Sequence, residues 1–329
     1  MNTTTMKWLL QREFWEHKGA MFWAPAIVGA LLVVLVGGTI GYGIFNYGMP
    51  GHVTVNGRTF GGDSMHVLVS ADLRIMIARI ASSSYLATAT PLLLVLSAVV
   101  FFYCLGALYD ERRDRSILFW KSLPVSDPMT VVSKAATAMI VAPLIAIAIA
   151  TVASLALLFI VCAAVGLQGM NMFGPVLASP DLYLGPLRLV ALLPVYVVWA
   201  LPTVGWLLLV SSWARTKPFL WAVGIPVVGL ILMKWISTAL LNFSGQELPL
   251  MPVAQDVVAR LLSGVVPGIW YTYPGMPQPL QPTQFGVDGN SIVTSAYASL
   301  AGIDAWIGAA AGALMLFGAT RLRRWRDEG

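Results

Sequence analysis

Groups that could carry out chemistry are sparse in this chain, because only 11% of its 329 residues are charged. Two ionisable residues, Lys234 and Asp304, fall inside or at the edge of long apolar runs. A charge within a membrane segment is costly and is usually retained for a function, so both residues are candidates for lining a substrate path. The alternative for Lys234 is that its long side chain reaches the membrane interface.

A second polar group consists of Asp63, His66 and Asp72, which lie close together in the sequence. Carboxylates and an imidazole are the groups that acid–base catalysis uses, but this spacing matches no recognised catalytic motif. A membrane-embedded enzyme, such as a lipid-modifying transferase or hydrolase, therefore stays open only as an alternative.

Several motifs of soluble enzymes are missing from the sequence. It contains no Gly-x-x-x-x-Gly-Lys-Ser/Thr phosphate loop, no His-Glu-x-x-His, no Gly-x-Ser-x-Gly and no Cys-x-x-Cys. We therefore expect no enzymatic activity, no cofactor and no metal site on this chain. Cys104 and Cys162 lie within apolar runs, which predicts two buried thiols rather than a disulfide.

The composition predicts how these groups are positioned. The chain is 58% hydrophobic with a mean hydropathy of +0.78, and soluble domains carry about 25% charged residues. Apolar runs of about 20 residues are long enough to cross a hydrocarbon core. We predict an all-α integral membrane protein forming a single domain over residues 1–329, with membrane spans at about 21–45, 90–109, 136–165, 187–213, 219–241 and 299–320.

The distribution of Lys and Arg orients these six spans. Fourteen Lys and Arg residues fall on the side that holds both termini, and four fall on the other side. Positive residues favour the cytoplasmic side, so both termini are expected on the cytoplasmic side of the membrane. The basic tail Arg321–Arg326 suits anionic lipid headgroups, and we expect no nucleic-acid partner.

Regions outside the spans also have a predicted structure. Residues 6–18 place Met6, Leu10 and Phe14 on one helical face, which predicts an interfacial helix before the first span. The loops 46–89 and 242–298 are expected outside the cytoplasm. Asn56-Gly57 predicts a β-hairpin, and Asp288-Gly289 is a weaker hairpin signal. Residues 68–86 predict a short helix on the outer surface.

Small and aromatic residues suggest how the helices pack. Gly37 and Gly41, and likewise Gly308 and Gly312, are spaced so that two helix backbones can approach closely. Such a pair serves packing within the chain as readily as dimerisation. Trp199, Trp206 and Trp213 form one stripe, for which packing in the core is a simpler explanation than a ligand cage.

The densest group of charges is the segment 110–135, between the second and third spans. It begins as a charged helix, and Leu123-Pro124 should break it. Asp127-Pro128 then resembles an N-cap followed by a proline in the first helical turn. The turn between these two helices, residues 115–124, is called the elbow below. It combines Phe119 and Trp120 with basic residues, as protein–protein interfaces do. It could also dip into the lipid headgroups.

At these residues the chain resembles the ABC type-2 permeases, the membrane subunits of type V ABC exporters. The matching pattern is Tyr109-x-Glu111-Arg112-Arg113-x-x-x-Ile117-x-Phe119-Trp120-Lys121-Ser122-Leu123-Pro124-Val125-Ser126, followed by Ser133-Lys134. An amphipathic N-terminal helix and six spans with cytoplasmic ends also match the family.

The resemblance implies a permease dimer, of identical or homologous subunits, bound to two separate ATPase subunits that hold ATP and Mg. The loop between the second and third spans would then be the coupling element. Its residues are Glu111, Arg112, Arg113, Arg115, Phe119, Trp120, Lys121, Leu123 and Pro124. The exported substrate is expected to be amphipathic or hydrophobic. A signalling or assembly subunit that transports nothing stays open as a second alternative.

Overall fold

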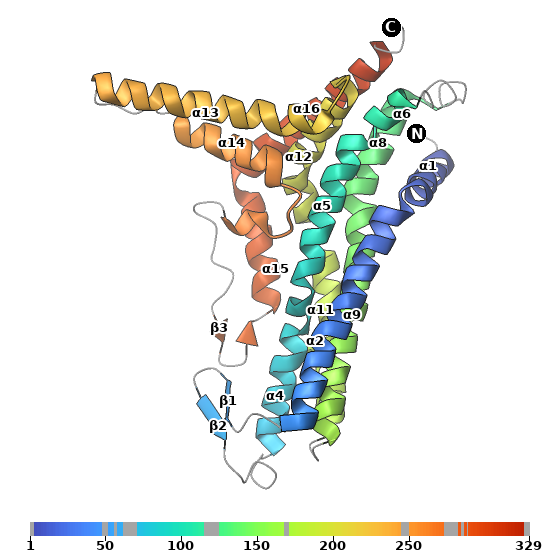
Figure 1. The fold of residues 1–329 in the computed structure, drawn as a ribbon, viewed down its shortest axis with the longest axis vertical. Coiled ribbons are helices and arrows are strands. Elements are labelled where there is room, and N and C mark those ends of the chain that lie inside the picture. The colour runs from blue at the N-terminus through green and yellow to red at the C-terminus, as the bar shows by residue number, and fades with distance from the viewer. Residues whose placement is uncertain are drawn as a thin grey trace.

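The structure is a computed structural model, and it describes residues 3–47, 52–55, 58–61, 71–114, 125–167, 171–244, 250–272, 282–283, 286–287 and 289–325. Within these residues, six helices are long and apolar enough to cross a membrane. They coincide with the six predicted spans, so the chain is a helical, multi-pass membrane protein. Figure 1 shows that several of them run side by side along the long axis of the molecule.

The described elements, with η marking π-helical or 3-10 turns, follow in chain order. They are α1 (Thr3–Glu16), η1 (Gly19–Trp23), α2 (Ala24–Tyr47), β1 (His52–Val55), β2 (Arg58–Gly61), α4 (Ala71–Ser84), η2 (Tyr85–Ala89), α5 (Thr90–Gly106), α6 (Tyr109–Arg113), α8 (Asp127–Ala136), η3 (Thr137–Val141), α9 (Ala142–Leu167), α10 (Phe173–Leu177), α11 (Pro180–Ala191), α12 (Leu193–Trp213), α13 (Pro218–Ser244), α14 (Met251–Ser263), η4 (Ile269–Thr272), β3 (Pro282–Thr283), β4 (Gly286–Val287), α15 (Gly289–Ala298), η5 (Ser299–Ala301) and α16 (Ile303–Trp325).

The longest helices exceed the thickness of a bilayer. α8, η3 and α9 form one continuous helix from Asp127 to Leu167, which is 41 residues long. At 1.5 Å per residue its length is about 60 Å, roughly twice the hydrocarbon core of a membrane. One end of the bundle must therefore extend beyond the bilayer.

Two prolines in the spans are accommodated by π-helical turns. Pro25 follows η1, and Pro143 follows η3, in each case two residues after the turn ends. At the end of each turn the amide of the next residue bonds to the carbonyl five residues earlier, Ala24 to Gly19 and Ala142 to Thr137. Proline has no amide hydrogen to donate, and its ring clashes with the carbonyl of the preceding turn. A wider π-helical turn next to the proline gives that carbonyl more room and leaves no amide donor missing from the turn.

The backbones of α12 and α16 approach each other closely. A Cβ atom added to Gly312 would lie 2.5 Å from the backbone carbonyl carbon of Leu201, and one added to Gly205 would lie 2.5 Å from the carbonyl oxygen of Gly312. Gly312 therefore serves packing within the chain. In the same core, Trp199 is fully buried and its Nε1 donates a hydrogen bond to Ser299 Oγ at 3.1 Å.

The other tryptophans of the stripe also pack internally. Trp206 Nε1 donates to the Ala222 carbonyl oxygen at 2.9 Å, and the Trp213 ring lies 5.0 Å from the ring of Trp221. Both contacts anchor the first turns of α13 to α12. Beyond them α13 is mostly exposed, and Figure 1 shows it leaving the bundle sideways and running across the direction of the other long helices.

The predicted outer segments differ in detail from the structure. The helix predicted at residues 68–86 is α4, but it continues through η2 into α5 instead of ending at the surface. Its packed face contains Ala78, Ser82 and Tyr85. Ser82 Oγ donates to Ser179 Oγ at 2.6 Å, and Tyr85 Oη, at the start of η2, donates to the carbonyl of Leu182 at 2.9 Å, so the two residues join α4 and η2 to the start of α11.

Two short strand pairs occur in the segments that were expected outside the cytoplasm. β1 and β2 pair antiparallel with Val55 opposite Arg58, on either side of residues 56 and 57, which lie outside the described part. The second hairpin prediction is displaced. β3 and β4 pair Thr283 with Gly286, whereas Gly289 begins α15. The Arg188 guanidinium packs against Gly289, since a Cβ atom there would lie 2.5 Å from Arg188 Nη1.

Candidate functional site

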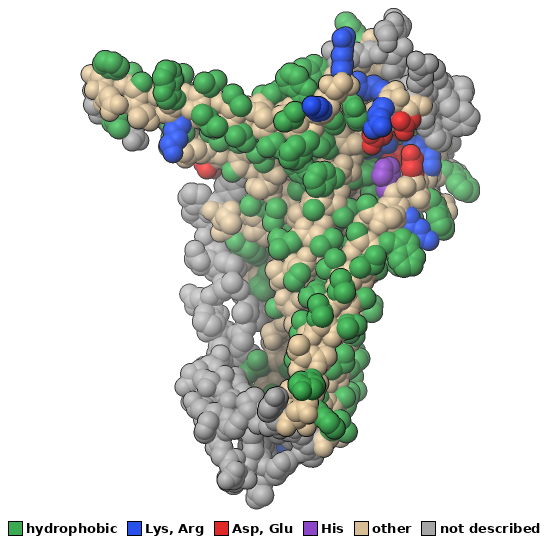
Figure 2. Space-filling model, in the orientation of Figure 1, with side chains coloured by type: hydrophobic (Ala, Val, Ile, Leu, Met, Phe, Trp, Pro, Cys, Tyr) green, Lys and Arg blue, Asp and Glu red, His purple; other side chains and the backbone are tan. Residues whose placement is uncertain are grey.

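Most of the charged side chains of the described residues gather at one end of the bundle. Figure 2 shows blue, red and purple side chains together where α1, α6, α8 and the last turns of α16 meet, and mostly green and tan surface along the helices. These four helices contribute six charged residues that form one ion-pair network: Arg12, Glu13, Glu111, Asp127, Lys134 and Arg323.

Glu13 is fully buried on the inner face of α1. Its Oε1 and Oε2 lie 3.0 and 3.1 Å from Lys134 Nζ, and Oε2 accepts a hydrogen bond of 2.8 Å from the hydroxyl of Tyr103. The neighbouring Arg12 guanidinium also donates to Oε1. The carboxylate therefore joins α1 to α8 and to α5.

Lys134 and Arg323 extend the network to the other helices. Lys134 is 1% exposed, and its Nζ also lies 2.9 Å from Glu111 Oε1 on α6. The second oxygen of Glu111 accepts a 2.7 Å bond from Arg323 Nη1 on α16. Arg323 Nε in turn donates to Asp127 Oδ1 at 3.2 Å, at the start of α8.

At the buried centre of the network, three cations face three carboxylates, and Arg12 also lies 3.9 Å from the exposed carboxylate of Glu16. Arg12, Lys134 and Arg323 each contact at least two acidic side chains. Buried charges are tolerated when they are paired and their hydrogen-bonding capacity is used, and removing one partner of such a pair costs about 3–5 kcal/mol. The network therefore holds α1, α6, α8 and α16 in one fixed arrangement.

The titration of Glu13 reflects this environment. Burial alone would raise the pKa of the Glu13 carboxyl, but the Lys134 ammonium and the Arg12 guanidinium outweigh burial and lower the pKa from its usual 4.5 to about 2. Glu13 is thus ionised at every physiological pH. The backbone carbonyl oxygen of Glu13 has a separate contact, since it lies 3.2 Å from His17 Nδ1.

A second set of contacts ties the same region to α12. The Arg112 guanidinium donates to the carbonyl oxygen of Ser211 and, at 3.0 Å, to that of Ala214. These are carbonyls at the end of α12, where a positive side chain satisfies unpaired acceptors and complements the helix dipole. Ser211 Oγ accepts 3.0 Å bonds from the amides of Leu108 and Tyr109.

The structure covers part of the predicted coupling element. Glu111 and Arg112 point into the fold and make the contacts above, whereas Arg113 is exposed. The remaining predicted residues lie outside the described part: Arg115, Phe119, Trp120, Lys121, Leu123 and Pro124. α8 begins at Asp127 with Ser126 as its N-cap, one residue before the predicted cap, and Pro128 occupies the first turn.

The other candidate residues are not brought together. Lys234 is exposed on α13 and Asp304 is exposed on the first turn of α16, and no salt bridge joins them in the part of the chain that the structure describes. The backbone carbonyl of Asp304 accepts a hydrogen bond from Arg260. Asp63 and His66 lie outside the described residues, and only the backbone of Asp72 is described.

Sequence reasoning missed the network as a unit. It identified an apolar face of Met6, Leu10 and Phe14 on the N-terminal helix, whereas the buried residues of that helix are Leu9 and Glu13. It assigned Arg323 to a lipid-facing basic tail, but Arg323 is 4% exposed. One available signal was Lys134, a lone charge two residues before a predicted span, which needs a partner.

Comparison of the chain with models of protein families, with curated proteins and with solved structures finds no match.

Proposed function

We propose that this chain is the permease subunit of an ATP-driven ABC exporter in a bacterial inner membrane. It would move an amphipathic or hydrophobic substrate outward with energy from two separate ATPase subunits, which hold ATP and Mg. Both termini and the network end of the bundle would face the cytoplasm, because Lys and Arg concentrate on that side.

One observation carries the proposal. The segment 115–124, which bears the permease-like motif, joins α6 to α8, and both of these helices are held by the buried network. Glu111 lies four residues before this segment, and Asp127, the first residue of α8, lies three residues after it. A force applied to the elbow by a partner would therefore reach α1 and α16 directly.

Mechanical coupling requires that the joined helices do not separate when they are pushed. Breaking one buried ion pair costs about 3–5 kcal/mol. Because Lys134 and Arg323 each bridge two carboxylates, separating the elbow from the bundle would break more than one pair. The Arg112 contacts add α12 to the unit that would move with the elbow.

A second permease subunit, identical or homologous, is part of the proposal. α13 is the surface we assign to it, since its apolar side chains are exposed along most of its length. Exposed apolar side chains on a spanning helix are also suited to lipid. Disulfide cross-linking between two copies of α13 distinguishes a subunit contact from a lipid-facing surface.

The proposal is tested by purifying the tagged chain from its native membranes. We expect an ATPase subunit with a phosphate loop to co-purify and to hydrolyse ATP, and Trp120→Ala with Leu123→Ala to abolish both. Trp23→Ala is the matched control, because Trp23 is exposed on η1 and far from the elbow in sequence. Co-purification and substrate-stimulated hydrolysis that are unchanged in the double variant would refute the coupling assignment.

Substrate flux separates the exporter from the two alternatives. Inverted vesicles that contain the complex should accumulate a hydrophobic dye when ATP is added. An ATPase complex without flux would indicate a signalling or assembly subunit. Turnover of lipid without any ATPase partner would indicate a membrane-embedded enzyme.

A further inference from the structure

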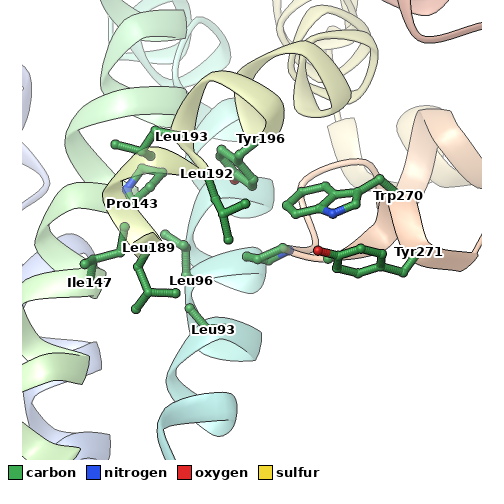
Figure 3. Close-up of a pocket in the computed structure, with 12 residues that line it drawn as sticks. Leu93, Leu96, Pro143, Ile147, Leu189, Leu192, Leu193, Tyr196, Trp270 and Tyr271 are labelled. Atoms are coloured by element: carbon green, nitrogen blue, oxygen red, sulfur yellow. The ribbon is translucent and has the colours of Figure 1, made fainter. Parts of the chain in front are cut away.

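Two pockets of the molecule differ in chemical character. The pocket in Figure 3, between α5, α9, the α11–α12 junction and η4, is lined almost wholly by apolar side chains. A larger pocket of about 560 Å³ lies at the network end of the bundle, between the start of α8 and the last turns of α16. We call it the basic pocket, and its walls include Ser126, Asp127, Phe317, Thr320, Arg321 and Arg324.

One wall of the basic pocket is a single face of α16. Phe317, Arg321 and Arg324 follow one another at intervals of four and three residues, so they lie one above the other on the helix surface. The Arg321 guanidinium carbon lies 5.2 Å from the centre of the Phe317 ring. The ion-pair network holds this face beside α8, because Arg323 Nε donates to Asp127 Oδ1 at 3.2 Å.

The basic pocket has an excess of positive charge. Among the described residues, no carboxylate forms a salt bridge with Arg321 or Arg324. Asp127 is the acidic residue of the described wall, and its charge is already balanced by Arg323. A guanidinium presents parallel N–H donors that match the oxygens of a phosphate group. The basic pocket therefore favours a phosphate-bearing anion.

The basic pocket lies at the level of lipid headgroups. Asp304 and Arg321 are about 26 Å apart along α16 at 1.5 Å per residue, which is close to the hydrocarbon thickness of about 30 Å. Trp306 and Trp325 are exposed near the two ends of the same helix, as residues at the two membrane interfaces commonly are. Arg321 and Arg324 therefore lie where the phosphates of one leaflet lie.

An apolar surface leads from the basic pocket toward the middle of the membrane. Phe317 is 58% exposed, and Leu314, about one turn further along α16, is 71% exposed. An acyl chain fits along these two side chains while its headgroup occupies the pocket. A free anion would use the arginines and leave this surface uncovered, so the continuity of the two features favours a lipid.

We propose that the basic pocket binds the headgroup of an anionic phospholipid, with Arg321 and Arg324 on its phosphate. A cavity of about 150 Å³ holds benzene, so the basic pocket has room for a phosphoglycerol headgroup of about ten non-hydrogen atoms. A zwitterionic headgroup would bring an ammonium group close to two guanidinium groups, which repel it. The inference requires only that α16 crosses the membrane, and it does not depend on the proposed export function.

The test uses the full chain, purified in dodecyl maltoside and freed of lipid, with native mass spectrometry to count the lipids that rebind. The probes are phosphatidylglycerol and phosphatidylcholine with identical acyl chains. We expect phosphatidylglycerol to fill one saturable site per chain and phosphatidylcholine to bind it at least tenfold more weakly. Arg321→Gln with Arg324→Gln should weaken phosphatidylglycerol at least tenfold, because charge-assisted hydrogen bonds are lost.

Two controls separate the basic pocket from general surface charge. Arg215→Gln with Lys217→Gln removes two exposed cations from the same end of the molecule, between α12 and α13, and should leave phosphatidylglycerol binding unchanged. Thr320→Phe narrows the basic pocket without changing its charge and should weaken phosphatidylglycerol at least tenfold. The unfolding midpoint without lipid shows whether each variant is folded, and Ser126→Phe narrows the opposite wall if Thr320→Phe is not.

Several results would overturn the proposal. Equal losses in the two glutamine pairs, or normal binding in a folded variant with a narrowed pocket, would show diffuse attraction to basic surface. Displacement of phosphatidylglycerol by an equal concentration of inorganic phosphate would identify a site for a free anion.

A protein partner is a separate outcome. If Arg321→Gln with Arg324→Gln binds phosphatidylglycerol normally but no longer retains an ATPase subunit, the two arginines contact that partner and the lipid assignment is wrong. The lipid measurement uses the isolated chain, so it stands or falls independently of whether any ATPase subunit co-purifies.

Discussion

Replacing Lys134 with methionine removes the charge at the centre of the ion-pair network while keeping a side chain of similar length. Lys134 Nζ lies 3.0 Å from Glu13 Oε1 and 2.9 Å from Glu111 Oε1, and the residue is 1% exposed. Without it, two buried carboxylates lose a shared partner, and Arg12 and Arg323 are left to balance them. We expect the folded state to lose stability.

The magnitude follows from two independent considerations. Removing one member of a buried ion pair costs about 3–5 kcal/mol. A carboxyl whose pKa falls from 4.5 to about 2 on folding contributes about 3 kcal/mol at neutral pH, and Lys134 is the largest favourable cause of that change at Glu13. The two figures agree, and at about 2–4 °C per kcal/mol they correspond to a fall in the unfolding midpoint of about 10 °C.

The assay is thermal unfolding in dodecyl maltoside, followed by size-exclusion chromatography with fluorescence detection. Arg113→Ala is the matched control, because Arg113 is an exposed cation on α6 and its removal should change stability by about 0.5 kcal/mol or less. The double variant Glu13→Gln with Lys134→Met should be less destabilised than the sum of its single variants, since the two residues are in contact.

The reasoning would be refuted by either of two results. Equal midpoints for Lys134→Met and Arg113→Ala would show that the buried pairs contribute no net stability. Strict additivity of the Glu13 and Lys134 substitutions would show that the two residues do not interact in the folded protein.

Three further predictions follow from other parts of the fold. Gly312→Leu should prevent α16 from packing on α12 and lower the unfolding midpoint by several degrees, because a Cβ atom at Gly312 already meets Leu201 at 2.5 Å and overpacking costs about 1–3 kcal/mol or more. The unfolding midpoint should depend on pH through Glu13. Its folded pKa is lowered, so its contribution is complete above pH 4.5 and is lost as the pH falls from 4.5 toward 2. Leu232→Cys, at an exposed position of α13, should form a disulfide between two copies of the chain in native membranes under mild oxidation.

Each of these has a matched comparison. Gly41→Leu should be tolerated, because a Cβ atom at Gly41 would meet nothing within 4 Å. Glu13→Gln should flatten the pH dependence between 4.5 and 2, and an unchanged slope would assign that dependence to another carboxyl. The cross-linking is done with Cys104→Ala and Cys162→Ala, which remove the two buried native thiols, and a failure to cross-link would argue against α13 as a contact between identical subunits.

Much of the fold could be predicted because membrane crossing is a local property. Whether a segment enters a bilayer depends on the transfer free energy of about 20 consecutive side chains, which composition alone supplies. The six predicted spans therefore coincide with the six long apolar helices. The two free cysteines were predicted as buried for the same reason, and both are.

The network could not be predicted, because its members come from four separate helices. Glu13 and Lys134 are 121 residues apart, and Glu111 and Arg323 are 212 apart. Hydrophobic periodicity reports which face of a helix is apolar, but it does not say which charged side chain of another helix will meet it. For α1 it identified the apolar face of Met6, Leu10 and Phe14, but it did not indicate that Glu13 would be buried against α5 and α8.

The sequence by itself therefore determined the class of this protein, the number and place of its long apolar helices, and the segment that resembles a coupling element. Only the tertiary structure decided that α4 continues into α5, that α13 leaves the bundle, that Glu111 and Arg323 face each other, and that the start of α8 and the end of α16 enclose a pocket. The physical reason is one of range. Burial in a membrane sums over neighbouring residues, whereas an ion pair or a cavity exists only where distant helices have already packed.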